Sequence, residues 1–192
     1  STAVVAATGI KTANNPTPCL LLMPSGRVLC FSWFRDSGGY SANVRVHYSD
    51  DDGASWTLGT DRALPVGVAI GGTPGAGASG YDVGRLRAAY HNGSICLVSE
   101  LKQHDTDPNY RDVLQQWASA DLGASFTEVG NAWDGGSPDY GKYHEVLSVD
   151  DSIFLFYLRG TDVRSRKIGS AFEAFETTSE TDPAIQARST IT

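Results

Sequence analysis

Short apolar runs separated by polar turns recur along the chain, and no stretch of a dozen residues keeps the 3.6-residue apolar period of an amphipathic helix. The runs come in pairs, and each pair is rich in β-forming residues on both sides of a turn signal such as Asn92-Gly93. This arrangement is typical of β-hairpins. The sequence therefore predicts three related hairpins, at residues 19–23 with 28–34, 86–90 with 95–101, and 145–149 with 152–158.

Each predicted hairpin is followed by a third short strand that runs into a turn with a shared motif. The motif reads Ser-x-Asp-x-Gly-x-Ser-aromatic in two copies, and a third copy has Lys167 in place of the aspartate. An aspartate at the head of such a turn can accept backbone N–H groups that the turn leaves unpaired, and the glycine supplies a positive φ. We therefore expect a structural role for Ser49, Asp51, Gly53, Trp56, Ser119, Asp121, Gly123, Phe126, Ser165, Gly169 and Phe172.

These three motif copies, each placed after an apolar hairpin, resemble the Asp-box (BNR) repeats of the sialidase superfamily. The resemblance covers the chain from about residue 16 to residue 175. It implies an all-β fold, a segment of a β-propeller made of about three four-stranded antiparallel blades with Asp-box turns. We expect a single propeller segment over residues 1–192, with blades at about 16–60, 81–130 and 143–178 and a glycine-rich insertion at 60–80.

A closed propeller needs roughly four to eight blades, so three predicted blades leave the ring open. Open blade edges present unpaired backbone groups that favour further pairing. We therefore expect the ring to be completed by further blades of the same chain or by self-association.

Composition narrows the classes of partner. The 192 residues contain 15 Lys plus Arg and 22 Asp plus Glu, which gives a net charge of −7. Nucleic acid and anionic membrane surfaces are therefore not expected partners, because both need clustered cations. No apolar run is long enough to span a bilayer, so no membrane insertion is expected. Three cysteines without a Cys-x-x-Cys pair predict neither a disulfide framework nor a zinc site, and no cofactor or metal is expected.

The sialidase resemblance can be tested at three positions that carry the chemistry of that family. Arg35 matches a family arginine that supports the substrate site. Pro16 stands where the family has an arginine for the substrate carboxylate, and Ser41 stands where it has the acid/base aspartate. Glycoside hydrolysis needs that carboxyl group, so no catalytic residue is predicted. A sialidase-like glycoside hydrolase fragment remains the alternative.

Two polar loops on the predicted functional side are candidate binding segments. Residues 103–111 are dense in oxygen ligands and could bind Ca²⁺ or a sugar, but they lack the spacing and closing Glu of an EF-hand, which favours a solvated loop. Residues 133–144 interleave aromatic rings with carboxylates, which suits stacking on a sugar but also packing between blades. The candidates in these loops are His104, Asp105, Trp133, Asp134, Tyr140 and Tyr143.

Arg35 and Arg159 are both expected at the end of the second strand of a blade. Two such cations facing one axial pocket could hold an anionic sugar, while salt bridges at the rim would serve equally well. The glycine-rich residues 71–80 lack the Gly-Lys-Ser/Thr ending of a phosphate-binding loop and are interpreted as a flexible insertion.

Together these features predict a non-catalytic recognition or structural module whose partner is a glycan or a protein surface. A purely architectural, self-assembling subunit is a further alternative. The family resemblance implies an extracellular, cell-surface or virion location, while the residues themselves leave a cytoplasmic one open.

Overall fold

The computed structural model describes residues 18–34, 43–63, 81–103, 112–134, 143–159, 161–175 and 178. Within these residues the backbone forms three antiparallel sheets in which each strand pairs with the next along the chain. The first sheet contains β1 (Cys19–Leu22), β2 (Val28–Phe34), β3 (Asn43–Ser49) and β4 (Thr57–Ala63). The second contains β5 (Tyr81–His91), β6 (Ser94–Gln103), β7 (Asp112–Ser119) and β8 (Thr127–Asp134). The third contains β9 (His144–Val149), β10 (Ser152–Arg159) and β11 (Asp162–Ile168).

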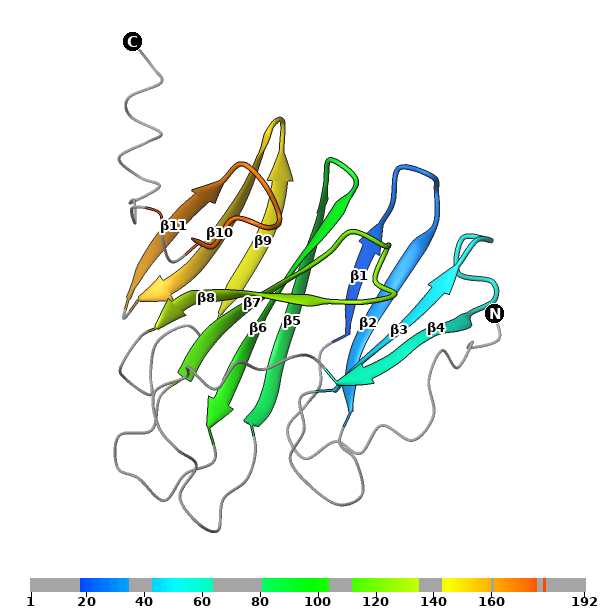
Figure 1. Cartoon of the computed structure of the whole chain (residues 1–192), viewed down its shortest axis with the longest axis horizontal. Coiled ribbons are helices and arrows are strands. Elements are labelled where there is room, and N and C mark those ends of the chain that lie inside the picture. Colours follow the sequence, from blue (N-terminus) through cyan, green and yellow to red (C-terminus); the bar gives the residue numbers. More distant parts are fainter. Residues whose placement is uncertain are drawn as a thin grey trace.

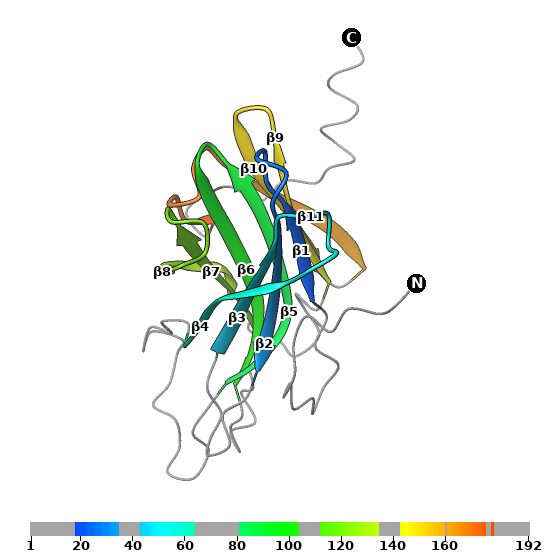
Figure 2. The same cartoon turned by 90° about the vertical axis from the view of Figure 1, so that its right-hand side faces the viewer.

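The three sheets lie side by side at their first strands and diverge from there. Strands β1, β5 and β9 are neighbours in space, and the later strands of each sheet lead away from them in different directions (Figures 1 and 2). The turns of the first hairpins, between β1 and β2, β5 and β6, and β9 and β10, lie on the same side of the molecule (Figure 1). This confirms the predicted all-β fold of propeller-like antiparallel sheets, with three rather than four strands in the described part of the third sheet.

The core consists of two apolar clusters, one on each side of the second sheet. Leu97 faces the first sheet and packs with Phe31, whereas Cys96 and Val98 face the third sheet and pack with residues such as Leu155. Alternate side chains of one strand therefore enter different clusters. Because both faces of the second sheet are covered, the β6 sequence Ile-Cys-Leu-Val is apolar at every position rather than alternating.

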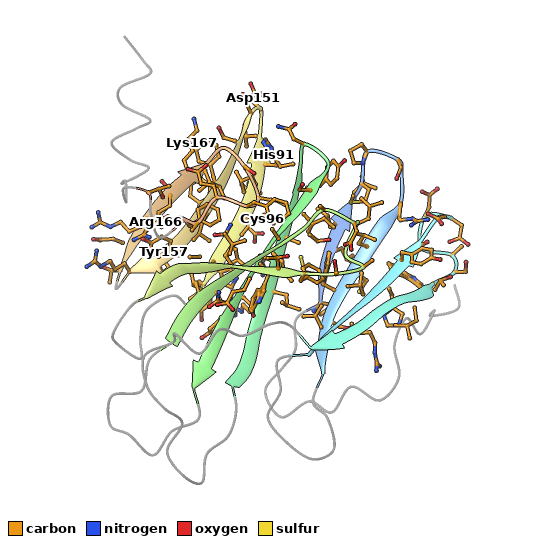
Figure 3. The ribbon with its side chains drawn as sticks, viewed as in Figure 1. His91, Cys96, Asp151, Tyr157, Arg166 and Lys167 are labelled. Carbon is orange, nitrogen blue, oxygen red and sulfur yellow. The ribbon has the colours of Figure 1, made fainter. Side chains whose placement is uncertain are left out.

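Polar contacts also join the second and third sheets (Figure 3). The Nδ1 atom of His91 lies 3.0 Å from the hydroxyl of Ser148. The guanidinium of Arg166 donates to the carbonyl oxygen of Phe175 at 3.1 Å and to that of Ala132 at 3.4 Å. The His91–Ser148 and Arg166–Ala132 contacts join the second sheet to the third, whereas the Arg166–Phe175 bond joins β11 to the turn that follows it.

The turn after β3 is organised around the carboxylate of Asp51. Its Oδ1 accepts hydrogen bonds from the amide of Ser55 and the hydroxyl of Ser49, both at 2.8 Å, and its Oδ2 accepts from the hydroxyl of Ser55 at 2.6 Å. The hydroxyl of Ser49 in turn accepts from the amide of Gly53 at 2.8 Å. The carboxylate and the hydroxyl together satisfy amides that the turn leaves without backbone partners.

The turn after β7 repeats the same hydrogen bonds around Asp121. In this second turn Gly123 has a φ of 87°, and a Cβ there would lie 3.6 Å from Val46 of the first sheet. The aromatic residue of the turn, Phe126, packs edge-on against Phe31 with ring centroids 6.4 Å apart. The second turn therefore lies against the sheet that precedes it in the chain.

The third turn is displaced by three residues from the place that the sequence motif predicts. Ser165 lies inside β11, paired with Phe156, and β11 continues to Ile168. Gly169 does not have the positive φ of Gly53 and Gly123. In the first two turns, the backbone amide three residues after the aspartate donates to the backbone carbonyl oxygen of that aspartate, as Ala54 does to Asp51. In the third turn, the matching hydrogen bond runs from the amide of Glu173 to the carbonyl oxygen of Ser170.

The displacement also changes which aromatic residue belongs to the third turn. The predicted Phe172 is 47% exposed, whereas Phe175 is fully buried in the cluster between the second and third sheets. The Glu173 carboxylate accepts from the amide of Gly169 at 2.8 Å. Lys167, which the motif placed at the aspartate position, is an exposed strand residue instead. The strand pairing thus moves the third turn three residues beyond the predicted one.

The two aspartate turns predict a loss of stability in acid. The hydroxyl and amide of Ser55, followed by the hydroxyl of Ser49, lower the pKa of Asp51 from 3.8 to about 2. Burial raises the pKa of Asp121, but hydrogen bonds from Ser125 and Ser119 outweigh it and lower the pKa overall. Because both pKa values are lower in the folded state, the stabilisation is complete above pH 3.8 and is lost as pH falls towards 2.

Replacing Asp121 with alanine is expected to lower the free energy of unfolding by about 1–3 kcal/mol at neutral pH, because turn amides lose their acceptor. Asp51→Ala is expected to change stability in the same direction. Urea unfolding at pH 7 and at acidic pH measures both effects. Asp52→Asn is the matched control from the same turn, because Asn tolerates the φ of 54° at this position. Unchanged unfolding midpoints in both variants at neutral pH would contradict the role of these carboxylates.

Candidate functional site

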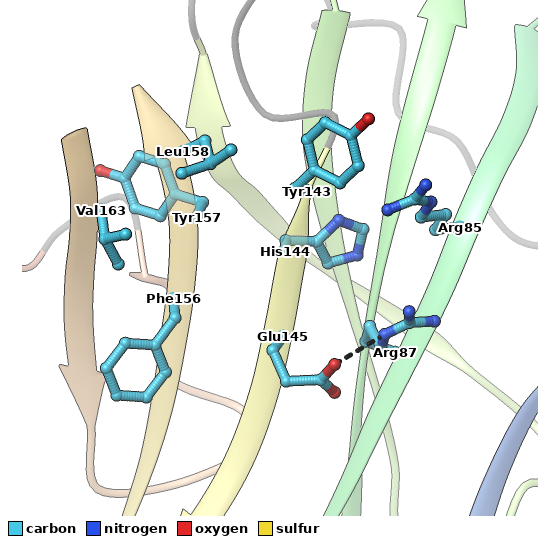
Figure 4. A pocket seen from close by; sticks show the side chains of 9 residues that line it. All are labelled: Arg85, Arg87, Tyr143, His144, Glu145, Phe156, Tyr157, Leu158 and Val163. Atoms are coloured by element: carbon cyan, nitrogen blue, oxygen red, sulfur yellow. Dashed lines mark hydrogen bonds and ion pairs between the residues drawn. The ribbon is translucent and has the colours of Figure 1, made fainter. Parts of the chain in front are cut away.

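An open surface pocket with a volume of about 300 Å³, called the cavity below, lies where the second and third sheets meet (Figure 4). Its walls come from β5, β9, β10 and β11 and from the residue that precedes β9. The residues that line it are Arg85, Arg87, Tyr143, His144, Glu145, Phe156, Tyr157, Leu158 and Val163. In Figure 4 the charged side chains of β5 and β9 lie at one end, and Phe156, Leu158 and Val163 lie at the other. The cavity is therefore polar towards the first strands and apolar towards β10 and β11.

The polar end is built by strand alternation in β5. Leu86 is fully buried between the first and second sheets, so Arg85 and Arg87, on either side of it, point towards the third sheet. The guanidinium carbon of Arg85 lies 4.4 Å from the ring centroid of Tyr143. The Nε of Arg87 donates to the Glu145 carboxylate at 3.0 Å. Each arginine of β5 thus has a partner at the start of the third sheet.

Hydrogen bonds fix part of this arrangement. Arg87 also donates to the carbonyl oxygen of Leu86 at 2.8 Å, which holds its guanidinium between the backbone and Glu145. His144 is buried, and its Nε2 lies 3.3 Å from the carbonyl oxygen of Val98, so this imidazole joins two sheets. Tyr143 is 55% exposed and presents its ring to the cavity. The exposed chemistry of the site therefore consists of Tyr143, the two arginines and Glu145.

These groups suit recognition of a polyhydroxylated ligand. An aromatic ring offers an apolar face for the C–H groups of a sugar, guanidinium groups donate hydrogen bonds, and a carboxylate accepts them. Glu145 is the one carboxylate among the described residues of the lining. Glycoside hydrolases of the usual kind need two carboxyl groups on opposite sides of the scissile bond. The described cavity therefore supplies the elements of binding more completely than those of hydrolysis.

The structure places the residues predicted from the sequence unevenly. Tyr143 lines the cavity. Arg159 is the last residue of β10, is exposed, and does not belong to the lining. Trp133 and Asp134 close β8, and their side chains lie outside the described part of the structure. The remaining candidates, Arg35, His104, Asp105 and Tyr140, lie outside the described residues.

Sequence reasoning missed Arg85, Arg87 and Glu145. The strand predicted at 86–90 contains Arg87 but begins one residue after Arg85, whereas β5 of the structure begins at Tyr81. In the longer strand the two arginines flank the apolar Leu86 and therefore lie on one face. Which neighbour that face meets depends on contacts between strands more than 50 residues apart, such as Arg87 with Glu145. The local pattern contains no information about that pairing.

The described residues contain neither a candidate metal site nor a candidate membrane-spanning helix. No group of three or more His, Cys, Asp or Glu side chains there is placed to hold a metal ion. No helix in the described part of the chain has the length and apolar character needed to cross a membrane. The three cysteines are free thiols, and burial raises the pKa of Cys96 to about 12 and that of Cys19 to about 11.

No family model matches the sequence, and no curated protein matches it either. Solved structures of propeller glycoside hydrolases are similar in fold. An α-L-arabinanase of Penicillium chrysogenum, solved with arabinobiose, superposes with a TM-score of 0.56 at 15% identity over 86% of this chain. An α-L-arabinofuranosidase of Fusarium graminearum, solved with an iminosugar inhibitor, gives 0.56 at 11% over 87%. A xylan β-1,4-xylosidase of Bacillus halodurans gives 0.55 at 13% over 81%.

This chain spans about half the length of the first two enzymes, 48% of each, and 29% of the xylosidase. The similarity therefore concerns part of a propeller. At identities of 11–15% the similarity establishes the fold only. The chemistry of this chain has to be argued from its own residues.

Proposed function

We propose that this protein is a carbohydrate-binding propeller module and that its binding site is the polar end of the cavity between β5 and β9. The observation that carries the proposal is the pairing of an exposed aromatic ring, Tyr143, with Arg85, beside the Arg87 and Glu145 ion pair. Rings and fixed hydrogen-bonding groups of this kind orient a sugar in a pocket.

The position of the site supports this function. Propeller blades place their first strands around the central axis, and β5 and β9 are first strands of neighbouring sheets. The fold is similar to that of enzymes solved with arabinobiose or a sugar-like inhibitor. The resemblance to sialidase repeats points to the same class of ligand and remains part of the proposal, together with an extracellular, cell-surface or virion location.

Hydrolysis is the second candidate, and Glu145 is the residue that favours it. Its side chain is 52% exposed at the polar end of the cavity, where a carboxyl group could act on a bound sugar. The Glu145 carboxylate accepts a hydrogen bond from Nε of Arg87 at 3.0 Å, which fixes its position at this end of the cavity. A second carboxyl group would have to come from outside the described lining.

The binding proposal can be tested with a glycan array followed by calorimetry on the strongest hit. We expect Tyr143→Ala to weaken binding by about tenfold or more, because stacking on the ring is lost. Arg85→Ala should weaken it as well, since this guanidinium donates into the same end of the cavity. Leu122→Asn is the matched control, because Leu122 is exposed in the turn after β7, away from the cavity, and should leave binding unchanged.

The same samples separate binding from hydrolysis. Incubation of the array hit, and of nitrophenyl arabinofuranoside, xyloside and sialoside, should give no released sugar if the protein only binds. Turnover that disappears in Glu145→Gln would favour the hydrolase instead. An array without a hit, or affinity that survives both Tyr143→Ala and Arg85→Ala, would contradict the proposed site.

A further inference from the structure

The tip of the hairpin between β5 and β6 has a reactive chemistry of its own. Asn92 and Gly93 are both exposed there, and they form the only Asn-Gly pair in the sequence. An asparagine that precedes glycine can react with its own backbone, because glycine has no side chain to keep its amide nitrogen away from the carbonyl carbon of the asparagine side chain. The product is a cyclic imide, which water opens to a carboxylate.

The backbone amide of Gly93 is available for this reaction. The hairpin pairs His91 with Ser94, so Asn92 and Gly93 are the two residues of the turn. Within the part of the chain that the structure describes, no hydrogen bond engages the Gly93 amide. A Cβ at this glycine would meet no atom within 4 Å, so no neighbouring side chain limits rotation of the tip.

The first aspartate turn supplies a contrast within the same molecule. Asp52 and Gly53 have φ values of 54° and 85°, close to the 46° and 84° of Asn92 and Gly93. However, the amide of Gly53 donates to the hydroxyl of Ser49 at 2.8 Å. An amide held in this way is not free to approach the side chain of the preceding residue. The two turns therefore differ in the freedom of the glycine amide rather than in these backbone angles.

The side-chain amide of Asn92 takes part in a contact between two sheets (Figure 3). Its Nδ2 lies 3.0 Å from Nε2 of the buried His91, whose Nδ1 lies 3.0 Å from the hydroxyl of Ser148 in β9. An amide nitrogen donates and does not accept, so Nε2 of His91 accepts and Nδ1 carries the ring proton. Two hydrogen bonds in series thus connect the hairpin tip to the third sheet.

We propose that Asn92 is a deamidation site and that its conversion to a carboxylate places a proton on Nε2 of His91. The Gly93 nitrogen attacks Cγ of Asn92 and forms the imide. The bond from Cγ to Nδ2 breaks, and this nitrogen leaves as ammonia with the proton of the Gly93 amide. Water then adds to either carbonyl of the imide and gives aspartate or isoaspartate. The only co-reactant is water, and both products carry one additional negative charge beside His91.

The new carboxylate changes what the imidazole must do. A carboxylate only accepts hydrogen bonds, so Nε2 of His91 has to carry a proton to face it. Ser148 tolerates this change, because its hydroxyl can donate to Nδ1 as well as accept from it. In isoaspartate the backbone runs through the side chain and is one carbon longer. A two-residue turn fixed by the pairing of His91 with Ser94 cannot hold that extra length without loosening.

The modification site is separate from the proposed sugar site. Asn92 lies seven residues beyond Arg85 along the chain, which corresponds to about 23 Å of extended strand. The tip also lies on the side where the turns of the other first hairpins lie (Figure 1). Deamidation therefore does not depend on sugar binding, and failure of one proposal leaves the other intact.

Peptide mapping by mass spectrometry tests the reaction on folded protein kept at neutral pH and body temperature. We expect Asn92 to become a mixture of aspartate and isoaspartate. The matched control is Asp52→Asn, which creates a second Asn-Gly pair whose glycine amide is held by Ser49. The introduced asparagine should react about tenfold more slowly than Asn92 of the same chain. An Asn92 that persists, or an introduced asparagine that is lost equally fast, would overturn the site.

Nitrogen NMR of the His91 ring tests the consequence. In the wild type we expect a protonated Nδ1 and an unprotonated Nε2. Asn92→Asp provides the aspartate product without the reaction, and its Nε2 should be protonated. Circular dichroism checks that this variant is folded. An Nε2 that stays unprotonated in folded Asn92→Asp would show that His91 does not respond to the carboxylate, and would overturn this part of the proposal.

Discussion

Replacing Trp117 with alanine is expected to lower the free energy of unfolding by about 3–5 kcal/mol. Trp117 is a fully buried residue of β7, in the middle sheet, and packs in the cluster between the first and second sheets. Its removal leaves a cavity that two rigid sheets cannot close, since both are held by their own strand pairing. Domains of this kind are stable by about 5–15 kcal/mol in total, so this single change removes a large share.

Urea unfolding followed by circular dichroism measures the effect. Trp117→Phe is the matched variant, because it keeps an aromatic ring and should cost clearly less than alanine. Asp151 is exposed in the turn between β9 and β10 and gives a surface control; Asp151→Asn should change stability by no more than about 0.5 kcal/mol. A loss below about 1 kcal/mol for Trp117→Ala would show that the sheets do not pack on this side chain.

The second large loss of stability is expected on replacing Gln116, a fully buried residue of β7 whose side chain forms hydrogen bonds with the turn after β11. Its Nε2 donates to the carbonyl oxygens of Ala171 and Glu173 at 3.1 and 2.9 Å. Its Oε1 accepts from the amide of Phe175 at 3.1 Å. Alanine would leave three backbone groups of the third turn without this partner, at about 1–3 kcal/mol for each group that stays unsatisfied.

Gln116→Met separates hydrogen bonding from volume, because methionine has nearly the same length and no amide. We expect Gln116→Met to be destabilised almost as much as Gln116→Ala, by about 3 kcal/mol or more. Hydrogen exchange at the amide of Phe175 should accelerate in both variants. If the methionine variant is as stable as the wild type, then packing rather than hydrogen bonding holds the turn.

Much of the fold could be predicted because its signals are local. The three hairpins follow from apolar runs around turn residues such as Asn92, whose φ of 46° is the left-handed conformation that Asn-Gly turns adopt. The aspartate turns follow from a motif whose members lie within eight residues of each other, and Asp51 contacts its own neighbours Ser49 and Ser55. Short-range hydrogen bonds of this kind do not need the rest of the molecule to define them.

The third turn could not be placed in the same way. The motif aligned Ser165 and Phe172, but the side chains of β10 and β11 alternate so that Ile168 and Phe175 enter the core. Burial of one face decides strand register, because a shift would move a whole apolar set to the wrong side. Without the aspartate, no local hydrogen bonds oppose that shift.

The sequence by itself determined that the chain forms hairpins, that two turns are fastened by aspartates, and that the modules repeat, because each property depends on residues close along the chain. Only the tertiary structure decided that Arg85 meets Tyr143 and that Arg87 meets Glu145. Contacts between sheets join residues far apart in sequence, and each sheet has two faces that can be packed. The physical reason is that apolar burial is non-directional and selects a neighbour by shape, so it leaves no short-range signature in the sequence.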